Sequence, residues 1–215
     1  TAGFAYARVR GKAPKRVILL GCSHRYHISK VSVYDIGTFE TPVGAFPVDE
    51  DFARELAGSL NSEPRASHLA EHSIEVQLPF LAMAVGQTSI VPVLFGNVSG
   101  WHVEVGQKLA QMAEPSDLVI ASTDLSHYLS QEHAHQTDRR TLDTLLTKDP
   151  AALVEGLERG KCAMCGGAAV VAAMAFALVR GAEAWSVLDY RTSAEVSGDY
   201  AQVVGYAAVS MENAE

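Results

Sequence analysis

Apolar residues follow two patterns along this chain, short unbroken runs and longer stretches with helical spacing. The unbroken runs predict strands, and in the first three the apolar character is continuous enough for burial on both faces of a sheet. The predicted strands are Arg16–Leu20, Ser89–Phe95, Asp117–Ala121, Ala184–Tyr190 and Gln202–Val209.

Helical spacing predicts six helices between these runs. In the first of them, Asp49 is a suitable N-cap, and Phe52, Leu56 and Leu60 recur at four-residue spacing. The predicted helices are Asp49–Leu60, Glu71–Val85, Trp101–Met112, Gln131–Leu146, Pro150–Leu157 and Gly167–Val179. Strands that alternate with helices predict an α/β fold, with a mostly parallel sheet layered between helices, in one domain over residues 1–215.

Composition and charge narrow the classes of partner. Hydrophobic residues make up 48% of the chain and charged residues 20%, which is ordinary for a soluble globular protein. The net charge of -8 argues against nucleic acid or a membrane surface as a partner, because both require a basic face. We interpret the basic residues near the start (Arg8, Arg10, Lys12, Lys15 and Arg16) as a solvated helix end and loop.

The cysteines and the longest uncharged segment bear on location. Three cysteines, Cys22, Cys162 and Cys165, are too few and too unevenly spaced for a disulfide framework. We therefore expect a reducing, cytoplasmic environment, in which each cysteine is buried, reactive or a metal ligand. The uncharged run 163–179 is rich in Ala and Gly, and we interpret it as a central buried helix rather than a membrane span.

Chemically capable side chains stand where predicted strands end or helices begin. Cys22 and His24 follow the first strand, Asp124 and His127 follow the third, and Cys165 precedes the Ala-rich helix. A further group, Glu71–Glu75, opens a predicted helix and contains His72. In α/β folds, ligands bind beyond the carboxyl ends of the strands. Imidazole and thiolate are ligands for zinc, iron and copper, so these segments predict a metal site.

The same residues also allow other kinds of chemistry, which the sequence supports to different degrees. Asp124 and His127 lie about one helical turn apart and are suited either to metal ligation or to acid/base chemistry. Ser23 and His24 are adjacent and no Gly-x-Ser-x-Gly elbow is present, which argues against a serine hydrolase. A single CxxC, Cys162–Cys165, rarely forms a structural zinc site.

The remaining histidines are weaker candidates. We interpret His102, His133 and His135 as surface residues. His68 has the spacing to ligate jointly with His72 but lies in a predicted loop.

Taken together, these segments resemble the Memo family, similar to the B protein of AmmeMemoRadiSam systems. Glu71–Phe80 (EHSIEVQLPF) is close to the Memo signature, and Gly21–His24 (GCSH) resembles its GPSH turn with Cys22 in place of proline. Ser122–Tyr128 (STDLSHY) resembles its S-[ST]-D-x-x-H element, and Cys165–Gly166 aligns with the CG before a long helix. The order and rough spacing agree across nearly the whole chain.

The resemblance implies a fold similar to class III extradiol dioxygenases. It also implies a metal pocket formed by His24, His72 and Cys165 and lined by Asp124 and His127. Family members bind iron or copper, an animal relative recognises phosphotyrosine peptides, and microbial relatives are often encoded beside a radical SAM protein. A small-molecule or peptide ligand and a radical SAM partner protein are the partners implied.

Two features depart from the family pattern. The sequence opens at Thr1 in what resembles the helix after the family's first strand, so we expect that strand and its loop, with a histidine, to be absent from these residues. Extradiol dioxygenases use two histidines and a carboxylate, whereas Cys165 would supply a thiolate, which favours softer metals such as copper(I) or zinc.

The sequence therefore leaves several functional hypotheses. The leading one is a dioxygenase-type oxidoreductase in which His24, His72 and Cys165 hold Fe(II), or alternatively copper or zinc, and His127 acts as general acid/base beside Asp124. The second is a binding module without turnover, with Arg25, Tyr26 and Tyr190–Arg191 as contacts for a phosphate or peptide. A metallohydrolase or a radical SAM partner is the third, and histidines that serve only the core are the last.

Overall fold

A four-stranded sheet carries the candidate site. The computed structural model describes residues 1–213, and its main sheet has the strand order β2-β5-β1-β6. Its strands are β1 (Arg16–Cys22), β2 (Val31–Val33), β5 (Ser89–Phe95) and β6 (Leu118–Ala121). β5 and β6 both pair in parallel with β1, and β2 pairs antiparallel with β5. Continuous apolar runs suit this central position, because both faces of β1 are buried.

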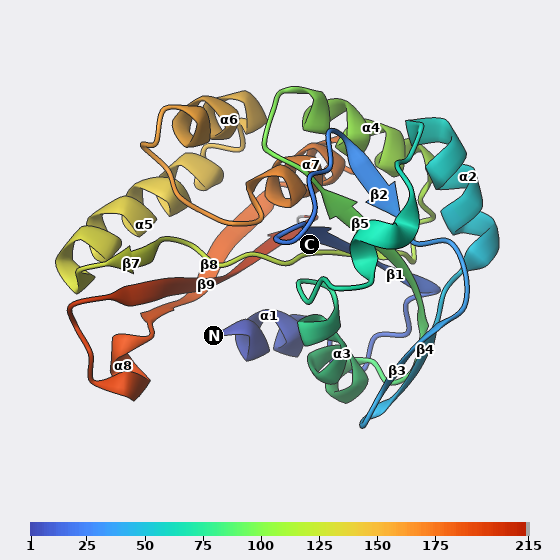
Figure 1. Cartoon of the computed structure of the whole chain (residues 1–215), viewed down its shortest axis with the longest axis horizontal. Helices are drawn as coiled ribbons and strands as arrows, with labels where there is room; N and C mark the ends of the chain where they lie inside the picture. The colour runs from blue at the N-terminus through green and yellow to red at the C-terminus, as the bar shows by residue number, and fades with distance from the viewer. Residues whose placement is uncertain (214–215) are drawn as a thin grey trace.

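Helices cover both faces of this sheet (Figure 1). Val17 and Leu19 of β1 pack in one core with Tyr6 and Leu81, whereas Ile18 and Leu20 pack in another with residues of α2, α4 and α7. The alternation follows from the two-residue period of a strand. The sequence prediction of a sheet layered between helices is confirmed.

Most predicted helices are present within one or two residues of their expected bounds. These are α2 (Glu50–Leu60), α4 (Trp101–Met112), α5 (Gln131–Leu146), α6 (Pro150–Glu158) and α7 (Gly167–Val179). Shorter elements that were not predicted as separate helices are α1 (Ala2–Arg8), η1 (Arg65–His68), η2 (Glu75–Gln77) and α8 (Ala194–Ser197). Ten residues of α7 are buried, so its interpretation as a central buried helix is confirmed. No helix within residues 1–213 is long and apolar enough to cross a membrane.

The helix predicted over Glu71–Val85 is wrong at its start. The α-helix α3 spans Leu78–Ala84, and Glu71 and His72 lie in a loop before η2. Pro79 stands in the first turn of α3, where its missing N–H costs nothing, so a proline there suits a helix start. His72 therefore sits on a loop rather than on a helix.

The last two predicted strands form an antiparallel sheet rather than extending the parallel one. β8 (Ala184–Thr192) pairs with β9 (Val203–Glu212), and β7 (His127–Leu129) pairs with the start of β9. A separate hairpin joins β3 (Thr38–Thr41) to β4 (Gly44–Pro47). β2, β3, β4 and β7 are too short or too polar to stand out as apolar runs, which is why the sequence did not predict them.

A groove separates the two sheets. It has a volume of about 670 Å³ and is lined by residues of α1, β6, α7 and β9. Within residues 1–213, β6 pairs with β1 and no strand covers its other edge. The expectation that the family's first strand is absent stays a prediction.

Two residues that were interpreted as solvent-exposed are buried. Arg16 is only 4% exposed, and its guanidinium pairs with Asp117, Asp49 and Glu114 at 2.9, 3.1 and 2.8 Å. Its carboxylate partners come from other segments, which residue type alone does not reveal. His102 is fully buried on α4, where its ring contacts Phe95 edge-on and Nδ1 lies 3.0 Å from the backbone N–H of Ser99.

Candidate metal site

The chemically capable residues gather beyond the carboxyl ends of β1 and β6, as α/β topology predicts. Cys22 is the last residue of β1, and His24 follows it by two positions. Gly21 permits the close approach of the next segment, because a Cβ at this position would lie 2.5 Å from Oγ of Ser73. The loop that carries His72 is thereby held against the end of β1, where the Ser73 hydroxyl donates to the carbonyl of Cys22 at 2.8 Å.

One carboxylate holds both candidate histidine ligands. Oε1 of Glu71 lies 2.9 Å from Nδ1 of His24 and 3.4 Å from Nδ1 of His72. The two imidazole rings stack with centroids 5.0 Å apart and planes inclined by 19°. When Nδ1 of each ring faces the carboxylate, Nε2 of each ring is left available as a metal donor. A carboxylate that orients a metal-binding histidine in this way is a common feature of metal sites.

Glu71 and His24 each stabilise the charged form of the other. Burial alone would raise the pKa of Glu71, but hydrogen bonds from His24 and from the backbone N–H groups of His24, Ser73 and His72 lower it to about 2. Burial opposes the charged form of His24, and its hydrogen bonds to Glu71 and Cys165 outweigh burial and raise its pKa. Glu71 was not singled out in the sequence, although an acidic residue directly before a candidate ligand was the available signal.

Cys165 lies next to the first turn of α7 as a stabilised thiolate. The neighbouring thiol of Cys22 is the largest cause that lowers the pKa of Cys165, burial opposes it, and the pKa lies well below that of a free thiol. The backbone N–H of Asp124 also donates to Sγ, at 3.2 Å. Gly166 lets this turn approach β6, since a Cβ there would lie 2.4 Å from the carbonyl oxygen of Ser122.

The donor atoms form three overlapping groups, in each of which all atoms lie within 4.8 Å of one another. The groups are Cys22, His24 and Cys165; His24, Glu71 and His72; and Asp124, His127 and Cys165. His24 and Cys165 each belong to two groups, so they link all the predicted site residues. Of the predicted ligands, His24 shares one group with Cys165 and another with His72, and no group contains all three. Cys22 and Glu71 are additional donors in these groups.

Asp124 and His127 flank Cys165. Nε2 of His127 lies 3.6 Å from a carboxylate oxygen of Asp124. Burial, followed by the charge of Cys165, raises the pKa of Asp124, and His127 partly opposes this. A half-buried carboxyl with a raised pKa beside an imidazole is suited to holding or transferring a proton.

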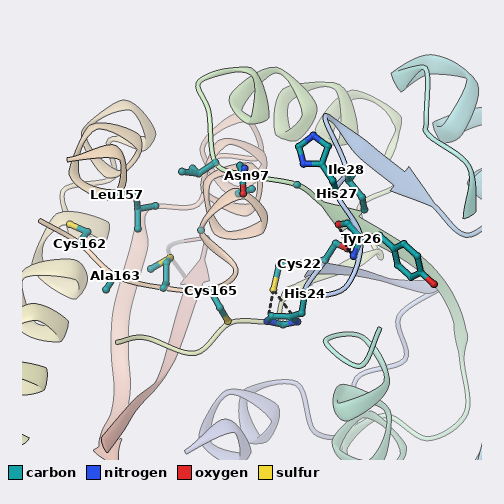
Figure 2. A pocket seen from close by; sticks show the side chains of 16 residues that line it. Cys22, His24, Tyr26, His27, Ile28, Asn97, Leu157, Cys162, Ala163 and Cys165 are labelled. Atoms are coloured by element: carbon teal, nitrogen blue, oxygen red, sulfur yellow. Dashed lines mark hydrogen bonds between the residues drawn. The ribbon is translucent and has the colours of Figure 1, made fainter. Parts of the chain in front are cut away.

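A pocket of about 400 Å³ opens over one part of this cluster. Figure 2 shows Cys22, His24 and Cys165 together at one end, Tyr26, His27 and Ile28 on one side, and Leu157, Cys162 and Ala163 on the other. Asn97, which follows β5, also lines it. Of the predicted site residues, His24 and Cys165 line this pocket, whereas His72, Asp124 and His127 do not.

Several other candidates have structural contacts of their own. His68 is buried, its Nε2 lies 2.9 Å from the carbonyl oxygen of Ser32, and burial lowers its pKa to about 4. Cys162 is buried beside Thr144, with Sγ 3.6 Å from the hydroxyl. The hydroxyl of Tyr190 donates to the buried Asp138 at 2.9 Å, and Arg191 pairs with Asp189 and Glu195. Tyr26 is the peptide-contact candidate that lines the pocket.

Comparison with known proteins identifies the family of this chain. A family model described as Memo-like protein matches residues 1–210. The MEMO1 family protein MK0963 of Methanopyrus kandleri is 37% identical over 203 residues, which are 91% of this chain and 72% of that protein. A MEMO1 family protein of Thermotoga maritima is 37% identical over 211 residues, which are 95% of this chain and 74% of the relative.

A solved structure shares the fold. The crystal structure of the uncharacterized protein JW3007 from Escherichia coli K12 matches with a TM-score of 0.63 at 12% identity, and the match covers 94% of this chain and 91% of that one. At this identity the likeness concerns the fold alone. The match to the family model over nearly the whole chain, together with the relatives at 37% identity, shows that this chain belongs to the Memo family.

Proposed function

We propose that this chain is a metal-dependent oxidoreductase of dioxygenase type, in which His24, His72 and Cys165 hold Fe(II), with copper or zinc as alternative ions. The observation that carries the proposal is the contact of Oε1 of Glu71 with Nδ1 of both histidines. A single carboxylate that fixes two imidazoles side by side has a clear use when both Nε2 atoms bind one ion.

The donor set suits a divalent transition metal. Two imidazoles and a thiolate are ligands that iron, copper and zinc accept, and the lowered pKa of Cys165 favours its thiolate form. Metal binding at such a site requires little proton release from the cysteine. The thiolate in place of a carboxylate shifts the preference toward softer ions relative to a site with two histidines and one carboxylate.

The other residues of the cluster would handle the substrate and its proton. An iron(II) ion bound here would supply one-electron and dioxygen chemistry. His127, 3.6 Å from Asp124, would accept a proton from an acidic substrate hydroxyl, and Asp124 would hold the imidazole in place. The pocket of about 400 Å³ is within the size range of small-ligand sites, and it is lined by His24 and Cys165 but not by Asp124 or His127. A ring-shaped substrate would therefore have to lie at its edge, next to Cys165, to reach His127.

Metal content tests the first part of the proposal. Anaerobically purified wild type would be analysed by elemental analysis and electron paramagnetic resonance, beside His72→Ala, Cys165→Ala and the control His27→Ala. His27 lines the pocket but belongs to none of the donor groups. We expect about one Fe(II) per chain in the wild type and the control, and loss of Fe(II) from both ligand variants. A wild type that holds no metal after loading with iron, copper or zinc would contradict the proposal.

Oxygen uptake tests the second part. Iron-loaded protein would be mixed with catechol-like substrates in an oxygen electrode, beside Asp124→Asn and His127→Gln. These variants should keep their metal and lose about 10²–10⁴-fold in rate, the usual contribution of a general acid/base. Metal binding without oxygen uptake on any catechol would leave a metal-holding protein and exclude ring cleavage of this substrate class.

A further inference from the structure

Cys22 brings a second sulfur to the site. Its Sγ lies 3.4 Å from Nε2 and 3.9 Å from Nδ1 of His24. Sγ of Cys22, a ring nitrogen of His24 and Sγ of Cys165 all lie within 4.8 Å of one another. Two ligands bound to one ion at about 2.0–2.3 Å can be at most about 4.6 Å apart, so only small side-chain movements would bring all three onto one ion.

The position of Cys22 in the fold is rigid. As the last residue of β1 it stands opposite Phe95 of β5 in the parallel ladder. The alternating apolar residues before it, 17 to 20, belong to the two cores that cover the sheet. Cys22 instead faces polar groups, since its sulfur contacts His24 and lies within 4.8 Å of the sulfur of Cys165 beyond the end of the strand (Figure 2). A buried thiol that contacts two potential metal ligands is not accounted for by apolar packing.

The pocket distinguishes this group from the group of His24, Glu71 and His72. Cys22, His24 and Cys165 all line the cavity of about 400 Å³, whereas His72 and Glu71 do not. An ion that enters through this pocket therefore meets two sulfurs and one imidazole first.

We propose that Cys22 is a metal ligand that forms, with His24 and Cys165, a two-thiolate, one-imidazole site for a soft d¹⁰ cation, Cu(I) or Zn(II). The inference rests on the proposed function in that His24 and Cys165 serve both sites. The two sites share these residues, so the soft ion and Fe(II) compete for the chain. Two thiolates favour Cu(I) and Zn(II) over Fe(II), and three ligands leave one coordination position open toward the pocket.

Competition titrations under anaerobic, reducing conditions test the proposal. Cu(I) and Zn(II) would each be titrated against a chromophoric chelator, and Fe(II) by equilibrium dialysis, for wild type, Cys22→Ser, Cys22→Ala and His72→Ala. Cys162→Ser is the matched control, because Cys162 is also buried but belongs to none of the donor groups. Circular dichroism would confirm that each variant is folded.

The expected results separate the two sites. In both Cys22 variants, the affinity for Cu(I) and for Zn(II) should fall about tenfold or more, whereas the affinity for Fe(II) should be nearly unchanged. His72→Ala should show the opposite pattern, and Cys162→Ser should match the wild type. In Co(II)-loaded protein, the thiolate-to-metal absorption should fall by about half in Cys22→Ser, because one of two sulfur ligands is lost.

The outcomes also separate this inference from the proposed function. If the Cys22 variants retain wild-type affinity for Cu(I) and Zn(II) and full Co(II) charge-transfer absorption, Cys22 is not a ligand, and the His24, His72 and Cys165 site is unaffected. If Fe(II) fails to bind while Cu(I) binding depends on Cys22, the iron proposal falls and the soft-metal site stands. Failure of every ion to bind overturns both.

Discussion

Both carboxylate oxygens of Glu71 bind His24, a residue 47 positions earlier in the chain. Oε1 lies 2.9 Å from Nδ1 of the ring, and Oε2 accepts a hydrogen bond from the backbone N–H at 2.5 Å. The orientation of the imidazole and the path of the chain after β1 therefore depend on the same side chain. Because Glu71 also contacts Nδ1 of His72, a change at this position reaches both candidate ligands.

Glu71→Gln should weaken metal binding by about 10- to 100-fold, because an amide orients the two imidazoles less firmly and makes each Nε2 a poorer donor. Isothermal titration with Fe(II), Cu(I) and Zn(II) would measure this. Glu75→Gln is the control, since it removes the same charge from an exposed position in η2. Equal affinities for the two variants would show that Glu71 does not support the site.

The contribution of Glu71 to stability should depend on pH. Its pKa is lowered to about 2 in the folded protein, so the carboxylate stabilises the fold above the unfolded pKa, and this stability is lost as pH falls toward about 2. At pH 7, Glu71→Gln should be less stable by about 1–3 kcal/mol, the cost of losing charge-assisted hydrogen bonds. Urea unfolding of both proteins between pH 7 and 2.5 should show the difference shrinking below about pH 4.5. A difference that is constant across this range would contradict the assignment.

The reactivity of Cys165 should report its hydrogen bond from Cys22. Because its pKa is lowered, Cys165 should be alkylated by iodoacetamide at a rate that changes little between pH 6 and 8 in the metal-free protein. Cys22→Ala removes the largest cause of the lowered pKa, so the rate in this variant should rise with pH over the same range. Mass spectrometry of the peptide that contains Cys165 would measure this, with Cys162 as the internal control. Identical pH profiles in both proteins would exclude the thiol–thiolate contact.

The contact of α4 with α7 should be intolerant of a single methyl group. A Cβ at Gly106 would lie 2.1 Å from the carbonyl oxygen of Ala172 and 2.8 Å from Cβ of Ala175, so Gly106→Ala should destabilise the protein by about 1–3 kcal/mol. Gly58 is the matched control within α2, because a Cβ there meets nothing within 4 Å. Gly58→Ala should stabilise the protein by about 0.5–1 kcal/mol through helix propensity. Thermal unfolding would compare the two, and a neutral Gly106→Ala would show that the helices can separate.

The sequence was sufficient for the elements whose signals are local. Unbroken apolar runs marked β1, β5 and β6 because a central strand is buried on both faces, and four-residue spacing marked α2 because one of its faces is buried. The strand-end rule and the Memo motifs then singled out His24, His72, Asp124, His127 and Cys165, which the structure brings into overlapping groups. The placement of a cluster beyond β1 and β6 was thus predictable.

The tertiary structure decided what depends on partners distant in the chain. Arg16 belongs to a basic run, and only folding places it among Asp49, Glu114 and Asp117, because burial of a charge depends on which carboxylates reach it. The contacts of Glu71 with His24 depend on folding for the same reason, since a hydrogen bond between residues tens of positions apart leaves no periodic trace in the sequence. Residue types and their spacing were enough to select the donors of a candidate metal site, whereas which of these donors face the pocket was decided only by the packing of β1 against α7.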